Sequence, residues 1–100
     1  MTPADSRLTT LEHAFQAFAD PTRLRILGLL AAGEVCVCNI HECLGIPQPT
    51  ASRHLAYLRK TRLVLARKDG LWSYYRLAPA KGAFHNRLLD CLAAGAADLS

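Results

Sequence analysis

The sequence predicts a mainly helical α+β domain with a single β-hairpin. Two short predicted helices lie between residues 39 and 60 and are separated by a turn that contains Gly and Pro. A β-prone segment follows at about residues 63–77, and the Asp69–Gly70 pair at its centre is a strong hairpin signal. Seven of the twelve Lys and Arg residues fall between residues 53 and 76, where Asp69 is the one acidic residue. Together these features predict a winged helix-turn-helix, with the hairpin as its wing.

The length of 100 residues corresponds to one domain, so we assign residues 1–100 to a single unit. Apolar residues make up 51% of the chain, a high share for so short a domain, which favours a surface covered by a partner chain. No apolar run approaches the length of a membrane span, and the start MTPADSRLTT lacks the pattern of a signal peptide. We therefore expect a cytoplasmic protein whose thiols stay reduced.

Three helices are predicted outside the helix-turn-helix. The first covers about residues 8–18, where Leu and Phe side chains recur at helical spacing. The next begins at Pro21, with Asp20 as its N-cap, and ends at Gly33. The last covers about residues 79–96 and carries its own apolar stripe. Because the first and last helices lie outside the minimal winged unit, we expect them to form a homodimer interface.

Within the helix-turn-helix, at about residues 39–60, the first helix is expected to end at Gly45 and the second to begin near Pro49. Apolar residues at i, i+4 and i+7 give the second helix one buried face and leave its polar and basic side chains outward. Such concentrated positive charge is typical of a surface that binds a polyanion. The sequence contains no catalytic constellation or nucleotide-binding loop, so we do not expect an enzyme.

Four segments carry a resemblance to a known family: FADPTRLRILGLL, EVCVCNI, LGIPQPTASRHLAYLR and LVLARKDGLWSYYRL. Together they resemble the ArsR/SmtB metal-responsive repressors, in particular the arsenic-responsive members, over about residues 11–92. The resemblance implies a homodimeric winged helix-turn-helix that binds double-stranded operator DNA and releases it when a metal or metalloid binds. It implies As(III) or Sb(III) as inducer, with no organic cofactor and no membrane partner.

The resemblance also implies which residues contact DNA. The second helix of the helix-turn-helix would read bases or phosphates, because Arg and Gln suit contacts to guanine and adenine edges. The wing would contact phosphates, which position the protein without reading sequence. The candidates on the two elements are Gln48, Thr50, Ser52, Arg53, Arg59, Arg67 and Lys68. His54, in the family's Ser-x-His-Leu pattern, is expected to pack or bond to backbone rather than bind metal.

Cys36 and Cys38 match the Cys-Val-Cys of the arsenic-responsive members, and soft thiolates select soft ions such as trivalent arsenic. Trivalent arsenic prefers three thiolates, but the family's third position holds His41 here, which is a poor arsenite ligand. Cys91, from its own chain or from the partner, is one candidate for the third ligand, and solvent or a small thiol is the other. Cys43 is a less favoured third ligand, because one ion could bridge it to the pair only if the helix unwinds. It shares an apolar face of its helix, so we expect it to be a small buried hydrophobe.

The backbone of EVCVC is expected to be extended, because the segment is β-branched and precedes the helix proper. Both sulfurs would then lie on one face. An ion bound between them would reshape the entry to the helix-turn-helix and lower the population competent to bind DNA.

Two other interpretations remain open. In a thiol redox or persulfide sensor of the same fold, Cys36 or Cys38 would pair with Cys91. In a small zinc-structured or redox module, His41 would join Cys36 and Cys38 with one further ligand. A zinc site of the kind some relatives carry on the last helix is not expected, because the residues available there, His85 and Asp90, are badly phased.

Overall fold

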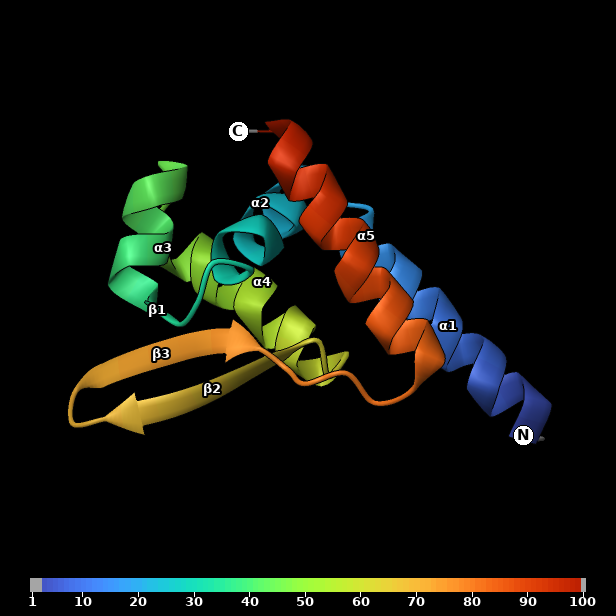
Figure 1. Cartoon of the computed structure of the whole chain (residues 1–100). Coiled ribbons are helices and arrows are strands. Elements are labelled where there is room, and N and C mark those ends of the chain that lie inside the picture. The colour runs from blue at the N-terminus through green and yellow to red at the C-terminus, as the bar shows by residue number, and fades with distance from the viewer. Residues whose placement is uncertain (1–2, 100) are drawn as a thin grey trace.

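The fold is a mainly helical domain with a small antiparallel sheet at one end. The computed structural model describes residues 3–99. Figure 1 shows the elements in chain order: α1 (Pro3–Phe18), α2 (Pro21–Leu30), β1 (Val35–Cys36), α3 (Val37–Leu44), α4 (Gln48–Lys60), β2 (Val64–Asp69), β3 (Trp72–Leu77) and α5 (Ala83–Leu99). The predicted helix-turn-helix is α3 with α4, and the predicted wing is β2 with β3. The winged helix-turn-helix architecture is therefore confirmed.

The start of α2 follows the predicted chemistry. Asp20 is the N-cap, and its carboxylate accepts a hydrogen bond of 2.9 Å from the backbone N–H of Arg23. This bond satisfies a helix N–H that has no partner within the helix, and it lowers the pKa of the Asp20 carboxyl. Pro21 occupies the first helical turn, where its missing N–H costs nothing.

Three helix starts differ from the sequence-based expectation. Helix α1 begins at Pro3 rather than near residue 8. Its first turn is polar, so the apolar spacing used to predict the helix did not reveal it. Helix α3 begins at Val37, two residues early, so that Cys38 is helical rather than extended. Helix α5 begins at Ala83 rather than at residue 79, after a connector that turns at Gly82 with a φ of 112°.

The sheet contains one strand that the sequence did not predict. Its order is β1-β3-β2, and both pairings are antiparallel. In the β1–β3 pairing, Val35 lies opposite Tyr75 and Cys36 lies opposite Tyr74. The two-residue strand β1 thereby attaches the start of α3 to the wing.

A tight turn joins α3 to α4. Gly45 is left-handed, with a φ of 67°, a conformation that glycine adopts at little cost. Its N–H donates to the carbonyl of Glu42 at 3.2 Å, and the N–H of Ile46 donates to the carbonyl of His41 at 3.1 Å. Pro47 then serves as the N-cap of α4. The turn satisfies carbonyls at the end of α3 and fixes the angle between the two helices.

The core lies where α2, α3, α4 and the base of the wing meet. Its largest fully buried side chains are those of Ile26, Leu27, Ile40, Leu55, Leu58 and Val64. The predicted apolar face of α4 is confirmed, because its three residues are all fully buried. Large apolar side chains stay exposed on the outer helices, however, notably Leu8 and Phe15 of α1 and Phe84 of α5.

No helix within residues 3–99 is long and apolar enough to cross a membrane.

Replacement of Leu55 by Ala should lower the free energy of unfolding by about 2–5 kcal/mol, because it leaves a cavity in the centre of this core. Urea denaturation followed by circular dichroism would measure the loss. The matched control is Leu71→Ala at the fully exposed wing tip, which should change stability by about 0.5 kcal/mol or less. Equal losses in the two variants would contradict this placement of the core.

Candidate sensor and nucleic-acid interface

Cys36 and Cys38 lie at the junction between strand β1 and helix α3. Cys36 is the last residue of β1 and the N-cap of α3, with extended φ and ψ of −71° and 145°, whereas Cys38 lies in the first helical turn. The change from extended to helical backbone brings the two Sγ atoms to 3.0 Å from each other. Cys36 is buried, at 7% exposure, and Cys38 is half-buried. One ion or reagent can therefore contact both sulfurs at once.

The two thiols differ in acidity. The pKa of Cys36 is lowered chiefly by a hydrogen bond from the Cys38 thiol, with help from the backbone N–H groups of Val37, Cys38 and Asn39. The pKa of Cys38 is raised, because ionisation of this donor would break the bond and place two negative charges together. The pair thus favours one thiolate, on Cys36, beside one thiol, and the thiolate is the nucleophile and the metal ligand.

The other two cysteines do not join this pair. The hollow beside the two sulfurs is lined by Glu34, Val35, Cys36, Cys38, Asn39, Trp72 and Tyr74. We call it the thiol hollow; neither Cys43 nor Cys91 lines it. No group of three or more His, Cys, Asp or Glu residues suited to a metal ion occurs among the described residues. Within the described part of one chain, the site therefore offers two cysteine sulfurs and no third protein ligand.

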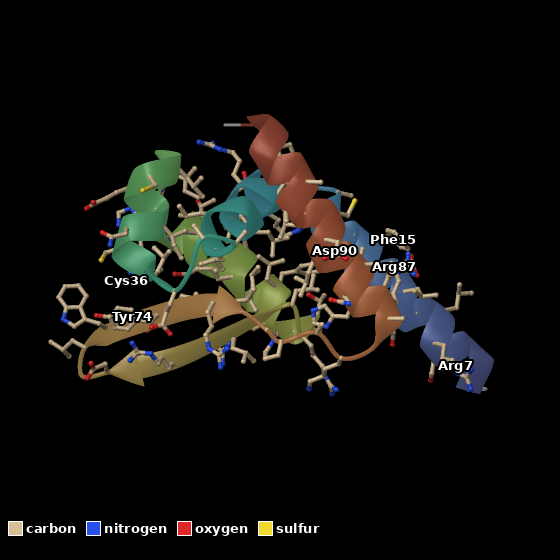
Figure 2. All side chains as sticks on the ribbon, in the orientation of Figure 1. Arg7, Phe15, Cys36, Tyr74, Arg87 and Asp90 are labelled. Carbon is tan, nitrogen blue, oxygen red and sulfur yellow. The ribbon has the colours of Figure 1, made fainter. Side chains whose placement is uncertain are left out.

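The expectation that Cys43 is buried is wrong. Cys43 is exposed, and so is Cys91 on α5. Helix α3 turns Ile40 fully into the core, but the covered sector is too narrow to reach the side chain three residues further on. Figure 2 shows Cys36 beside Tyr74 at the wing end of the molecule, whereas Phe15 lies with α1 and α5 at the other end.

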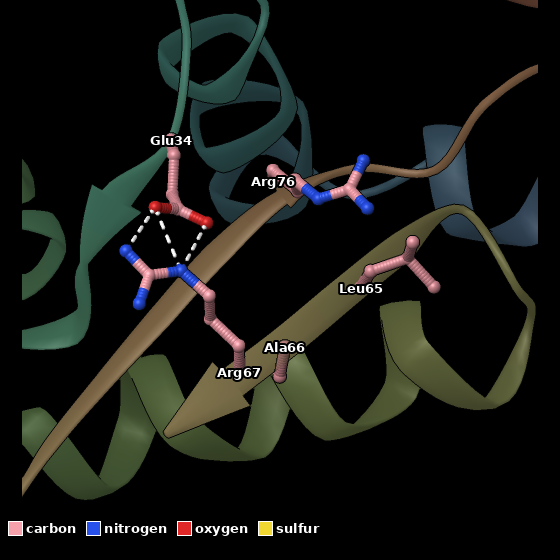
Figure 3. A pocket seen from close by; sticks show the side chains of 5 residues that line it. All are labelled: Glu34, Leu65, Ala66, Arg67 and Arg76. Atoms are coloured by element: carbon pink, nitrogen blue, oxygen red, sulfur yellow. Dashed lines mark hydrogen bonds and ion pairs between the residues drawn. The ribbon is translucent and has the colours of Figure 1, made fainter. Parts of the chain in front are cut away.

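An ion pair ties the wing to the segment that precedes the thiols. Figure 3 shows the Arg67 guanidinium against the Glu34 carboxylate, with Nε and Nη2 donating over 2.7 to 3.0 Å. The same guanidinium lies over the Tyr74 ring, 4.5 Å from its centroid. Arg67 holds the pKa of the Glu34 carboxyl below its usual value. Glu34 was not among the residues predicted from the sequence, because only the pairing of β1 with β3 brings it to Arg67.

The candidate DNA contacts form an exposed or half-exposed set on α4 and the wing. Gln48, Arg53 and Arg59 are exposed on α4, and Thr50 and Ser52 are half-buried. Lys68 is exposed near the wing tip. His54 is turned away from this set, and its Nδ1 lies 4.0 Å from the Asp20 carboxylate that caps α2. That position agrees with a packing role for His54.

Comparison with known proteins identifies the family. The family model described as "Bacterial regulatory protein, arsR family" matches residues 20–65. An arsenic resistance transcriptional regulator of Pseudomonas putida is 40% identical over 84 residues, which cover 83% of this chain and 73% of that protein. The chain belongs to the ArsR family. Members of this family are DNA-binding transcriptional regulators, so the protein is not an enzyme.

Two further matches are a second arsenic-related repressor and a solved structure. The arsenical resistance operon repressor of Escherichia coli is 47% identical over 77 residues, or 76% of this chain and 66% of that protein. A solved homodimeric winged helix-turn-helix DNA-binding domain of Mycobacterium bovis, a possible ArsR-family regulator, matches with a TM-score of 0.80 at 34% identity. That match covers 98% of this chain and 88% of the solved one, so the fold described above is a fold of the family.

Replacement of Cys38 by Ala should raise the pKa of Cys36, because it removes the main hydrogen-bond donor to the thiolate. The pH dependence of iodoacetamide alkylation, followed for Cys36 by peptide mass spectrometry, would measure the shift. Alkylation should begin at a higher pH in the variant than in the wild type. Cys43→Ala, at an exposed thiol of the same helix, should leave the profile unchanged. An unshifted profile in Cys38→Ala would rule out this interaction.

Proposed function

We propose that this ArsR-family protein is an As(III)- or Sb(III)-responsive transcriptional repressor that binds operator DNA as a homodimer. The proximity of the Cys36 and Cys38 sulfurs, 3.0 Å apart at the junction of the wing sheet and α3, carries the proposal. Relatives named as arsenical resistance operon repressors support the inducer class. The bound ion would link the two sulfurs by soft metal–thiolate bonds.

The position of the pair suggests how binding is reported. Cys36 is held by the β1–β3 ladder, and Cys38 belongs to the first turn of α3. A ligand shared by the two sulfurs fixes the angle between β1 and α3, and α3 is joined to α4 by the tight turn at Gly45. If the ligand favours an angle at which α4 and the wing no longer contact DNA together, the protein releases the DNA. The size of the effect is set by the difference in ligand affinity between this state and the DNA-competent state.

Exposed apolar side chains on the outer helices support the homodimer. Leu8 is 65% exposed and Phe15 is 56% exposed on α1, although the Phe15 ring already contacts Phe84 of α5 edge-on at 5.6 Å between centroids. A second copy would remove this apolar surface from water. The solved Mycobacterium bovis domain is homodimeric, which agrees with this arrangement.

The proposed DNA contacts divide into two kinds. Gln48 and Arg53, which are exposed in the first half of α4, would reach base edges in the major groove, with Thr50, Ser52 and Arg59 as further contacts. Lys68 would contact phosphates from the wing. Arg67 is shared between Glu34 and any phosphate that it contacts, so Glu34 competes with DNA for this guanidinium.

Arsenite titrated into a preformed complex with fluorescent DNA from upstream of its own gene tests the proposed function. Under reducing conditions, fluorescence anisotropy should fall at low micromolar arsenite. The response should be absent in Cys36→Ser and retained in Cys43→Ser, which removes an exposed thiol from the same helix. No release by arsenite, but loss of binding with a persulfide donor or a mild oxidant, would support the redox alternative instead.

Replacement of Glu34 by Gln should strengthen DNA binding at low salt, because it frees Arg67 for a phosphate. The plot of log affinity against log salt should become steeper by about one. Glu42→Gln, which removes the same charge from an exposed site on α3, controls for net charge. A slope equal to that of the control would mean that Arg67 contributes no phosphate contact.

A further inference from the structure

The thiol hollow offers fewer arsenic ligands than trivalent arsenic requires. Arsenic in this state forms three bonds, and the hollow supplies two sulfurs. Of its other polar groups, the Glu34 carboxylate is occupied by three hydrogen bonds from Arg67. The Asn39 amide is a hard ligand that suits arsenic poorly. Two protein bonds therefore leave one arsenic bond to be filled from outside the described chain.

Two aromatic side chains, Trp72 and Tyr74, line the hollow beside the aliphatic Val35. Tyr74 lies opposite Cys36 in the β1–β3 pairing, and Trp72 lines the hollow two residues earlier on β3. Trp72 is 56% exposed, although tryptophan usually buries most of its surface. The hollow is open and has a volume of about 470 Å³, more space than a single ion fills. An apolar group placed here would cover exposed aromatic surface next to the sulfurs.

We propose that the pair is built for a trivalent arsenical with one organic substituent, R–As(OH)₂, which brings its own third bond as carbon. The substituent R packs against Trp72 and Tyr74, while arsenic binds Cys36 and Cys38. This inference rests on the proposed function, because it keeps the same two thiols as the sensor and specifies the ligand class.

The binding step balances without an oxidant or a reductant. Each of the two sulfurs forms a bond to arsenic as one As–O bond breaks. The two thiol protons leave with the two hydroxyl groups as two molecules of water. The As–C bond is kept, arsenic stays trivalent, and the sulfurs are not oxidised.

Calorimetric titration of the full chain with phenylarsonous acid, methylarsonous acid and arsenite tests the ligand class directly, without DNA. A phosphine reductant replaces small thiols, so that no added sulfur can complete the arsenic. We expect the order of affinity phenyl, methyl, arsenite, with arsenite weaker than the methyl compound by about tenfold or more. The fluorescence of Trp72, the single Trp of the chain, should change most with the phenyl compound.

The aromatic wall is tested by substitution. Any close dithiol binds phenylarsonous acid, so the informative quantity is the ratio of phenyl to methyl affinity. Trp72→Ala should lower this ratio by about tenfold, the scale of one aromatic contact. Leu71→Ala, at the neighbouring exposed residue that does not line the hollow, should leave the ratio unchanged. An unchanged ratio in Trp72→Ala would overturn the role of the wall.

The other outcomes separate this inference from the proposed function. If arsenite binds as tightly as the organic compounds, or if Cys91→Ser weakens arsenite alone, then a third ligand is available and the inference fails. The arsenic-responsive function would stand in both cases. If none of the three compounds binds, the inference and the proposed function fail together.

Discussion

The backbone pairing of β1 with β3 is the contact on which the arrangement of the sensor depends. It places Cys36 opposite Tyr74 and carries Glu34 to Arg67. The strand contains only two residues, and a backbone hydrogen bond contributes about 0.5–1.5 kcal/mol net. Coupling between two ligand sites is typically about 1–3 kcal/mol. The attachment is thus strong enough to define the site and weak enough for a ligand to rearrange.

The attachment of β1 to β3 also changes the charge that the wing presents, because it brings an acidic residue to a wing arginine. The segment from residue 53 to residue 76 is strongly basic in sequence, but one of its guanidinium groups is paired with a carboxylate from outside the segment. Arg67 also lies over Tyr74, whose neighbour across the ladder is Cys36. The same few side chains therefore connect the thiols, the sheet and the surface proposed for DNA.

Local signals made most of the fold predictable. Asp20 with Pro21 marked the start of α2, Asp69–Gly70 marked the hairpin, and the apolar spacing of α4 identified its buried face. These features depend on residues close together in the chain, for which physical preferences are known.

Non-local contacts were less accessible from the sequence. Strand β1 exists only because a segment some forty residues further along pairs with it, and Glu34 and Arg67 are 33 residues apart. The cysteine pair itself was recognised, but its geometry was not, since Cys38 is helical. The prediction that Cys43 is buried was wrong, because periodicity alone does not determine how wide the covered face of a helix is.

The rigid connection of α3 to α4 lets a small movement of the short sensor segment displace the whole of α4. Pro47 restricts the backbone after Ile46, and two hydrogen bonds close the turn, so the two helices have little freedom to bend relative to each other. A small rotation at the first turn of α3 is then not absorbed at the joint. The rotation is transmitted to α4, and the displacement grows with distance from the turn along the thirteen residues of that helix.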